Sequence, residues 1–219
     1  WNWKANGSGS SNTNGSINST VSANVDAGFS IVSYTGTDND ETVGHGLSKA
    51  PEVVIVKRRN SSGNWASAWT PIASSSNQMY LNSTAAAESN NVNTFNATTF
   101  RVNGWSDVVV NGGTYIAYCF HSVDGYSKVG SYTGNGNADG TFVYTGFRPA
   151  YVMIKNATAA GSWEVYDATR DDDNVVFEVL QPNASDAEVT VGGGRLDFTS
   201  NGFKLRNTGG SVNGSGNTL

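Results

Sequence analysis

Two tryptophans, Trp65 and Trp163, each follow a glycine-containing turn and stand 98 positions apart. The apolar face of a sugar stacks on an exposed indole ring, so tryptophans on two units would bind a glycan at two points. The competing interpretation is that each indole fills a core, because a duplicated unit also duplicates its packing. Trp65 and Trp163 are therefore the candidate ligand-binding residues.

The densest acidic cluster of the sequence is Asp171-Asp172-Asp173. Loops of this kind supply the carboxylate oxygens that Ca²⁺ prefers as ligands. The three aspartates are the candidate metal site, with an exposed turn as the competing interpretation. Both interpretations also apply to a second acidic group, made up of Asp38, Asp40 and Glu41. No cofactor is expected apart from this possible Ca²⁺.

Glycoside hydrolysis would require two carboxylates that face each other across the scissile bond. On one strand, such residues are two positions apart, because alternate side chains share a face. Glu164 and Asp167 are three apart and are expected on opposite faces. We therefore predict no catalytic residues and no enzymatic activity, and a polysaccharide depolymerase is the weakest hypothesis.

Histidine and cysteine chemistry is limited to three residues, His45, His121 and Cys119. A single cysteine forms no internal disulfide, and His45, with His121 as the only other histidine and no cysteine nearby, is not expected to bind zinc. Cys119 lies in an apolar stretch, which indicates a buried thiol acting as a small hydrophobic side chain.

An internal duplication sets the positions of these residues. Ser33–Gly36 returns as Ser131–Gly134, and Val53–Lys57 returns as Tyr151–Lys155, both after 98 positions. The same offset pairs Phe100 with Phe198 and Trp105 with Phe203, among other residues. The repeated positions are apolar residues, turn glycines, a proline and a tryptophan, whereas the acids and histidines do not repeat. The duplication therefore indicates how the chain is built rather than a catalytic site.

Composition narrows the fold class. The chain has 219 residues, of which 37% are hydrophobic and 14% charged, and it is rich in Gly, Asn, Ser and Thr. These residues favour turns over helix interiors, so we expect an all-β protein of two tandem jelly-roll or β-sandwich units. The net charge of −5 argues against nucleic-acid binding, and no apolar run has the ~20 residues of a membrane span.

We expect three segments along the chain. Residues 1–25 would be a partial closing strand of a preceding unit followed by a Gly/Ser/Asn linker, 26–122 the first repeat, and 123–219 the second repeat without its last strand. Trp1–Gly7 resembles Tyr118–Gly125, the closing strand of the first repeat and its exit. Either the chain is part of a longer array, or Trp1–Ala5 completes the second repeat in the same or a neighbouring chain.

Several long motifs carry a resemblance to a known family. They are Trp3–Gly7, Gly28–Gly36, Val43–Leu47, Gly125–Gly136 and Tyr144–Ala150. Together they resemble a family of repeated domains in marine bacteriophage virion proteins. The resemblance implies lectin-like, concanavalin-type jelly rolls in tail fibres, spikes or capsid-surface appendages, and it carries no catalytic residues.

The predicted function is that of a non-enzymatic structural or adhesion protein at the virion surface, outside the cell. A carbohydrate-binding lectin module is the alternative. The expected partners are other virion proteins, further copies of the chain joined by strand complementation, and a host surface glycan.

Overall fold

The computed structural model describes residues 2–37, 40–72, 78–88 and 92–219. These residues fall into two compact units: unit 1 is Trp1–Tyr80 with Glu88–Val129, and unit 2 is Leu81–Ala87 with Gly130–Leu219. The described part of the chain is built from antiparallel strands, with one short helix in unit 2. The prediction of an all-β sandwich protein is confirmed.

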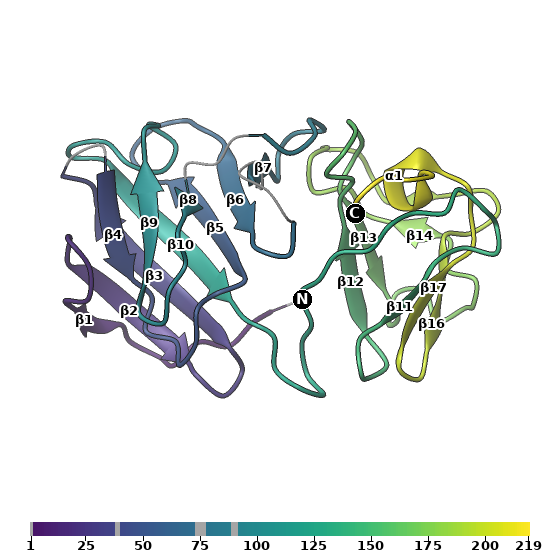
Figure 1. Cartoon of the computed structure of the whole chain (residues 1–219), viewed down its shortest axis with the longest axis horizontal. Coiled ribbons are helices and arrows are strands. Elements are labelled where there is room, and N and C mark those ends of the chain that lie inside the picture. The colour runs from purple at the N-terminus through teal and green to yellow at the C-terminus, as the bar shows by residue number, and fades with distance from the viewer. Residues whose placement is uncertain (1, 38–39, 73–77, 89–91) are drawn as a thin grey trace. The chain divides into compact units, whose positions relative to one another are not determined.

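Seven antiparallel strands form the larger sheet of unit 1 (Figure 1). In pairing order they are β1 (Ser10–Asn12), β2 (Ser19–Asn24), β3 (Phe29–Thr35), β10 (Thr114–Phe120), β5 (Val53–Arg58), β6 (Trp65–Trp69) and β7 (Gln78–Tyr80). The central strand β10 is the last of these in the sequence. Its burial alternates: Ala117 and Cys119 are buried, whereas Ile116 and Tyr118 are partly exposed. This period of two gives the sheet an inner and an outer face.

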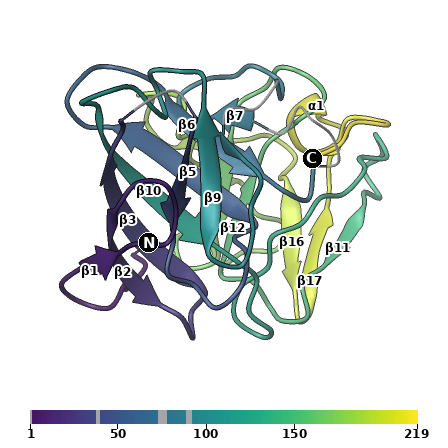
Figure 2. The ribbon, with the colours of Figure 1, turned by 60° about the vertical axis from the view of Figure 1, so that its left-hand side comes forward.

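A second sheet of unit 1 contains β4 (Asp40–Gly44), β9 (Thr99–Asn103) and β8 (Val92–Asn93). Figure 2 shows β9 in front of β5 and β10. The core consists of apolar side chains from both sheets, such as Val32, Val56 and Phe100, all of which are fully buried. Removing these apolar surfaces from water is the main favourable contribution to the sandwich.

The N-terminal region corrects the prediction for residues 1–25. Much of the expected linker forms β1 and β2, which pair with each other and, through β2, with β3. Low apolar content suggested that this stretch could not repay its ordering entropy. The edge of β3 changes this balance, because β2 adds a full hydrogen-bonded ladder to it while burying Val21.

Trp3 also belongs to unit 1. Its ring lies edge-on to Phe120, with the centroids 5.8 Å apart. The Lys4 carbonyl accepts a hydrogen bond from Asn24 Nδ2. Residues 2–6 form no strand, and Trp1 lies outside the described residues. The described part of Trp1–Ala5 is thus held beside β2 and β10.

Unit 2 contains a sheet in the order β11 (Phe142–Tyr144), β17 (Gly202–Leu205) and β16 (Leu196–Thr199). Two strand pairs join β12 (Tyr151–Ile154) to β13 (Glu164–Asp167) and β14 (Glu178–Val179) to β15 (Val189–Thr190). The helix α1 (Gly210–Asn213) precedes the last residues. The core gathers Tyr166, Leu196 and Leu205, which are fully buried.

Equivalent hydrogen bonds demonstrate the duplication in three dimensions. The Tyr34 hydroxyl donates to the Val108 carbonyl at 2.7 Å, and the Tyr132 hydroxyl donates to the Val212 carbonyl at 2.6 Å. Thr133 pairs with Thr218 just as Thr35 pairs with Thr114. The offset is 98 at the first partner of each pair and 104 at the second.

The growth in offset corrects one expected pairing. The ring of Tyr34 lies edge-on to Phe100 at 6.3 Å, and that of Tyr132 lies edge-on to Phe203 at 6.1 Å. Phe203, rather than Phe198, is therefore the counterpart of Phe100, and it is not the counterpart of Trp105. A repeat with insertions keeps its contacts while its sequence offset drifts.

The expected repeat boundary between 122 and 123 falls a few residues early, since unit 1 continues to Val129. Unit 2 also includes Leu81–Ala87, which lies far from it in sequence. The Thr84 carbonyl accepts a hydrogen bond of 2.8 Å from the Gly161 amide. Unit 2 is thus discontinuous along the chain.

Candidate ligand-binding face

The outer face of the seven-stranded sheet carries a continuous row of side chains. Strand register places one residue from each of six of its strands in this row: Ser11, Thr20, Ser33, Ile116, Lys57 and Trp65. All six are exposed or partly exposed. Neighbouring strands are about 4.8 Å apart, so Ser33 and Trp65 lie roughly 14 Å apart across the sheet. The row runs from hydroxyl groups at one end to an aromatic ring at the other.

Trp65 forms an aromatic platform together with Tyr118. Their rings are nearly parallel, at 18°, with centroids 6.4 Å apart, and 37% of Trp65 is exposed. Ring stacking holds the indole in one orientation without hiding it from solvent. The platform can therefore accept the apolar face of a ligand without reordering the side chain first.

A shallow polar depression of about 300 Å³ lies at the hydroxyl end of the row. Its lining includes Ser33, Thr35, Thr114 and Arg59. Arg59 is exposed, and its guanidinium forms no ion pair with the described residues. Hydroxyls that both donate and accept, next to a planar cation, suit a polyhydroxylated or acidic ligand.

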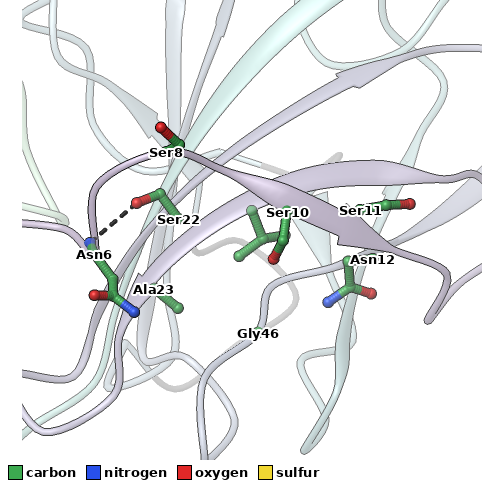
Figure 3. A pocket seen from close by; sticks show the side chains of 9 residues that line it. Asn6, Ser8, Ser10, Ser11, Asn12, Ser22, Ala23 and Gly46 are labelled. Atoms are coloured by element: carbon green, nitrogen blue, oxygen red, sulfur yellow. Dashed lines mark hydrogen bonds between the residues drawn. The ribbon is translucent and has the colours of Figure 1, made fainter.

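A second polar pocket, of about 190 Å³, lies beside β1 and β2 (Figure 3). Ser10 and Asn12 lie on the side of β1 that faces the chain at Gly46. One wall is fixed where the Asn6 amide donates to Ser22 Oγ at 3.0 Å. The pocket contains serine and asparagine side chains but no aromatic or charged group. It lacks a stacking surface, so the outer face is the stronger candidate.

Trp163 has a different environment from Trp65. It is 1% exposed, and its backbone amide donates to Asn183 Oδ1 at 2.7 Å. The segment around Leu180 to Asn183 runs along β13 and covers this region. A buried indole cannot stack on a sugar from solution, so Trp163 fits the core interpretation and Trp65 the platform interpretation.

In the acidic cluster, the carboxylate of Asp171 binds backbone amides of its own loop. Asp171 is 8% exposed, and its Oδ2 accepts the amides of Phe177 and Glu178 at 2.6 and 2.9 Å. Its Oδ1 accepts the amide of Asp173 at 3.2 Å. Asp172 and Asp173 are exposed. The three carboxylates do not converge on one point.

In the second acidic group, Asp40 binds Arg101 with two hydrogen bonds of 2.7 and 2.6 Å. Glu41 is buried and accepts hydrogen bonds from Ser16 and Thr37. Asp38 lies outside the described residues. Within the part of the chain that is described, no three acidic, histidine or cysteine side chains are placed to hold a metal ion.

Glu164 and Asp167 are both buried on β13. Glu164 accepts the hydroxyl hydrogen of Tyr166 and lies 3.3 Å from Arg195 Nε. Asp167 Oδ1 accepts the amide of Thr169 at 2.7 Å. Both carboxylates thus bind groups of their own unit.

His45 is also fully buried, and both ring nitrogens are engaged. Nδ1 accepts the Leu47 amide at 3.1 Å, so Nε2 carries the hydrogen that the Asn96 carbonyl accepts at 3.1 Å. Burial lowers the pKa of His45. Cys119 is buried as predicted, and burial raises the pKa of its thiol to about 12.

The sequence prediction included Trp65 but not the hydroxyl row beside it. Ser11 and Thr20 stand in the stretch predicted to be a linker, and Ser33 lies on the outer side of a predicted strand. The available signal was the alternation in Ser19–Asn24, where Val21 and Ala23 alternate with hydroxyl residues. That pattern is typical of a strand with one polar face.

The fold and this face define an all-β sandwich protein with a hydroxyl-rich outer sheet surface. The chain belongs to the family described as a domain of unknown function (DUF7483), which matches residues 1–219. No curated protein and no solved structure is detectably similar to it. Among the described residues, no helix combines the length and apolar character needed to cross a membrane.

Proposed function

We propose that the protein is a non-enzymatic adhesion module that binds a saccharide chain on the outer face of unit 1. The observation that carries this proposal is the alignment of the Trp65–Tyr118 platform with the hydroxyl row and Arg59 on one sheet face. An indole takes the apolar face of a sugar ring, while hydroxyl and guanidinium groups bind its oxygens.

The resemblance to phage virion proteins supports a location on a virion surface, outside the cell, with a host glycan as ligand and other virion proteins as neighbours. Adhesion at such a surface needs only weak single contacts, because many copies raise the overall avidity. The open, shallow shape of the face suits a long glycan better than a small enclosed ligand.

A glycan array, followed by calorimetric titration of any hit, tests the proposal. We expect Trp65→Ala to weaken binding at least tenfold, which corresponds to about 1.4 kcal/mol. The matched control is Trp105→Ala, which removes an indole that is 49% exposed and follows β9 rather than lying on the outer face. Arg59→Gln should weaken acidic glycans more than neutral ones.

Two results would overturn the proposal. One is the absence of saturable binding to any glycan, which would leave a purely structural role. The other is equal affinity of the Trp65→Ala and Trp105→Ala variants. Release of reducing sugar that is abolished by Glu164→Gln would instead support a hydrolase.

A further inference from the structure

The strand β11 lies beside β17 in unit 2, and one of its two edges is open (Figure 2). Among the described strands it pairs with β17 alone. The Thr141 carbonyl accepts the Leu205 amide at 3.0 Å, and the Thr145 amide donates to the residue before β17. Because bonding groups alternate in direction along a strand, the amides and carbonyls of Phe142 and Tyr144 point away from β17. These groups face the open edge.

The equivalent edge of unit 1 is covered. Val43 of β4 pairs with Phe100, just as Val143 of β11 pairs with the counterpart of Phe100. A segment of the N-terminal region lies along β4: the Ser16 amide donates to the Thr42 carbonyl at 3.0 Å, and the Thr42 amide donates to Ser16 Oγ at 2.8 Å. Val43 is completely buried, whereas Val143 is only partly buried. The fold therefore accepts a further segment along this edge, and the described residues of unit 2 supply none.

The sequence along the open edge reads nearly the same in both directions. Residues 140–146 are Gly-Thr-Phe-Val-Tyr-Thr-Gly, with Val143 at the centre. When two such strands lie antiparallel about Val143, glycine meets glycine, threonine meets threonine, and Phe142 meets Tyr144 of the second copy. The stretch contains no charged residue and no proline, which are the residues that protect many edge strands from pairing. The edge is thus complementary to itself.

This register also joins the free backbone groups. Phe142 and Tyr144 both face the open edge, so each pair of Phe142 with Tyr144 of the second copy exchanges both main-chain hydrogen bonds. Val143 stands opposite itself in a pair without such bonds, where side chains come closest. A shift by one residue would instead oppose the free groups to residues that already bond toward β17.

The exposed side chains of β11 fit the same partner. Phe142 is 45% exposed and Tyr144 is 65% exposed. Their neighbours on β17 are Lys204, which binds Asp139 at 2.7 Å, and Gly202, which has no side chain. Neither neighbour offers a ring, whereas a second copy places one beside each of the two aromatic residues. Aromatic pairs across strands stabilise a sheet and remove apolar surface from water.

We propose that the open edge of β11 joins two copies of the chain through an antiparallel pairing centred on Val143. The strands β16, β17 and β11 of each copy then form half of one continuous sheet. Because β11 has only 3 residues, the contact is small and reversible. Paired copies would present two ligand-binding faces together, which raises avidity. The pairing lies in unit 2 and goes beyond the saccharide proposal, which concerns unit 1.

Sedimentation equilibrium of the full chain at increasing concentration tests the pairing. We expect a monomer–dimer equilibrium with a Kd below about 1 mM. The variant Phe142→Lys with Tyr144→Lys opposes like charges in both pairs and should dimerise at least tenfold more weakly. Its matched control, Phe142→Lys with Tyr144→Glu, opposes lysine to glutamate in this register and should dimerise at least tenfold more strongly than the double-lysine variant. Trp65→Ala should leave dimerisation unchanged, so the two proposals fail separately.

Cross-linking locates the centre of the pairing independently. Val143→Cys places a thiol opposite itself in the second copy, and oxidised glutathione should convert this variant to a disulfide-linked dimer. The matched control is Thr145→Cys, which stands opposite Thr141 of the second copy and should cross-link at least tenfold more slowly. Cys119 is buried and does not compete for the oxidant.

Three results would overturn the proposal. The first is a monomer at every concentration up to about 1 mM. The second is equal dimerisation of the two charged variants, and the third is faster cross-linking of Thr145→Cys than of Val143→Cys. If Val143→Cys does not fold, the charged variants decide the question, because Phe142 and Tyr144 are both exposed.

Discussion

The hydroxyl of Tyr132 donates a hydrogen bond to the carbonyl of Val212, with 2.6 Å between the two oxygens. This bond ties the first strand-like segment of unit 2 to its helix α1. Tyr34 makes the equivalent bond to Val108 in unit 1. Both tyrosines are mostly buried, and burial raises the pKa of each phenol, so the hydroxyl remains a donor across the physiological range.

Tyr34→Phe and Tyr132→Phe should each lower the free energy of unfolding of their own unit by about 1–3 kcal/mol. Each change leaves a buried carbonyl oxygen without its donor. Chemical denaturation followed by calorimetry measures the loss. A variant that unfolds like the wild type would show that water replaces the missing hydroxyl.

Trp65→Ala and Trp163→Ala should differ sharply in stability. Trp163 is 1% exposed, so its truncation should cost about 3–5 kcal/mol. Trp65 is 37% exposed and stacks on Tyr118, so its truncation removes less buried surface and should cost clearly less than that of Trp163. Thermal unfolding of the two variants compares them directly. Equal destabilisation would mean that Trp65 is a core residue rather than a platform.

Glu164→Ala should destabilise unit 2 by about 3 kcal/mol, because Arg195 loses its partner in a largely buried setting. Alanine itself fits this position in the duplicated fold, since Ala66 stands there in unit 1. The double variant with Arg195→Met should therefore recover most of the loss. Denaturant titration of both single variants and the double variant completes a double-mutant cycle, which measures the interaction energy of the two side chains. Additive losses would show that the two side chains are energetically independent.

His45 should make the stability of unit 1 depend on pH. Its pKa in the folded chain is lowered by burial, while the unfolded chain has a value of about 6.5. Below about pH 6.5 the unfolded state therefore binds more protons, and the free energy of unfolding falls as pH falls. The slope from this residue is at most about 1.4 kcal/mol per pH unit.

The matched control is His45→Gln, which retains a polar side chain and does not titrate. The difference between the pH profiles of the wild type and this variant isolates His45, since His121 and the carboxylates are common to both. Parallel profiles between pH 5 and 7 would contradict the prediction.

Cys119 should resist thiol reagents in the native chain. Burial raises the pKa of its thiol to about 12, and the thiolate is the reactive form. Labelling with an aromatic disulfide should follow the opening of unit 1 and accelerate with denaturant. Cys119→Ala gives the background signal, and rapid labelling without denaturant would show that the strand β10 opens locally.

The alternating strands and the duplication could be predicted from the sequence because local patterns carry them. The apolar run Val53–Val56 predicts a strand inside a sheet, and β5 lies between β10 and β6, although its outer side chains are partly exposed. Ser10–Asn24 contains two strands rather than the predicted linker, because its hydrogen-bond partner, β3, is a tertiary feature that local composition does not contain. The sequence also could not predict that Trp65 and Trp163 differ in burial. This difference depends on tertiary packing around two equivalent positions, which leaves Trp163 1% exposed and Trp65 37% exposed.

The position of β10 also has a consequence for folding order. This strand forms the middle of the seven-stranded sheet, yet it is the last strand of unit 1 to be synthesised. It pairs Phe120 with Phe29, residues that are far apart along the chain. Contacts between residues this far apart form slowly, and β3 and β5 lack their shared neighbour until β10 emerges. Unit 1 therefore completes its fold only after Phe120 leaves the ribosome.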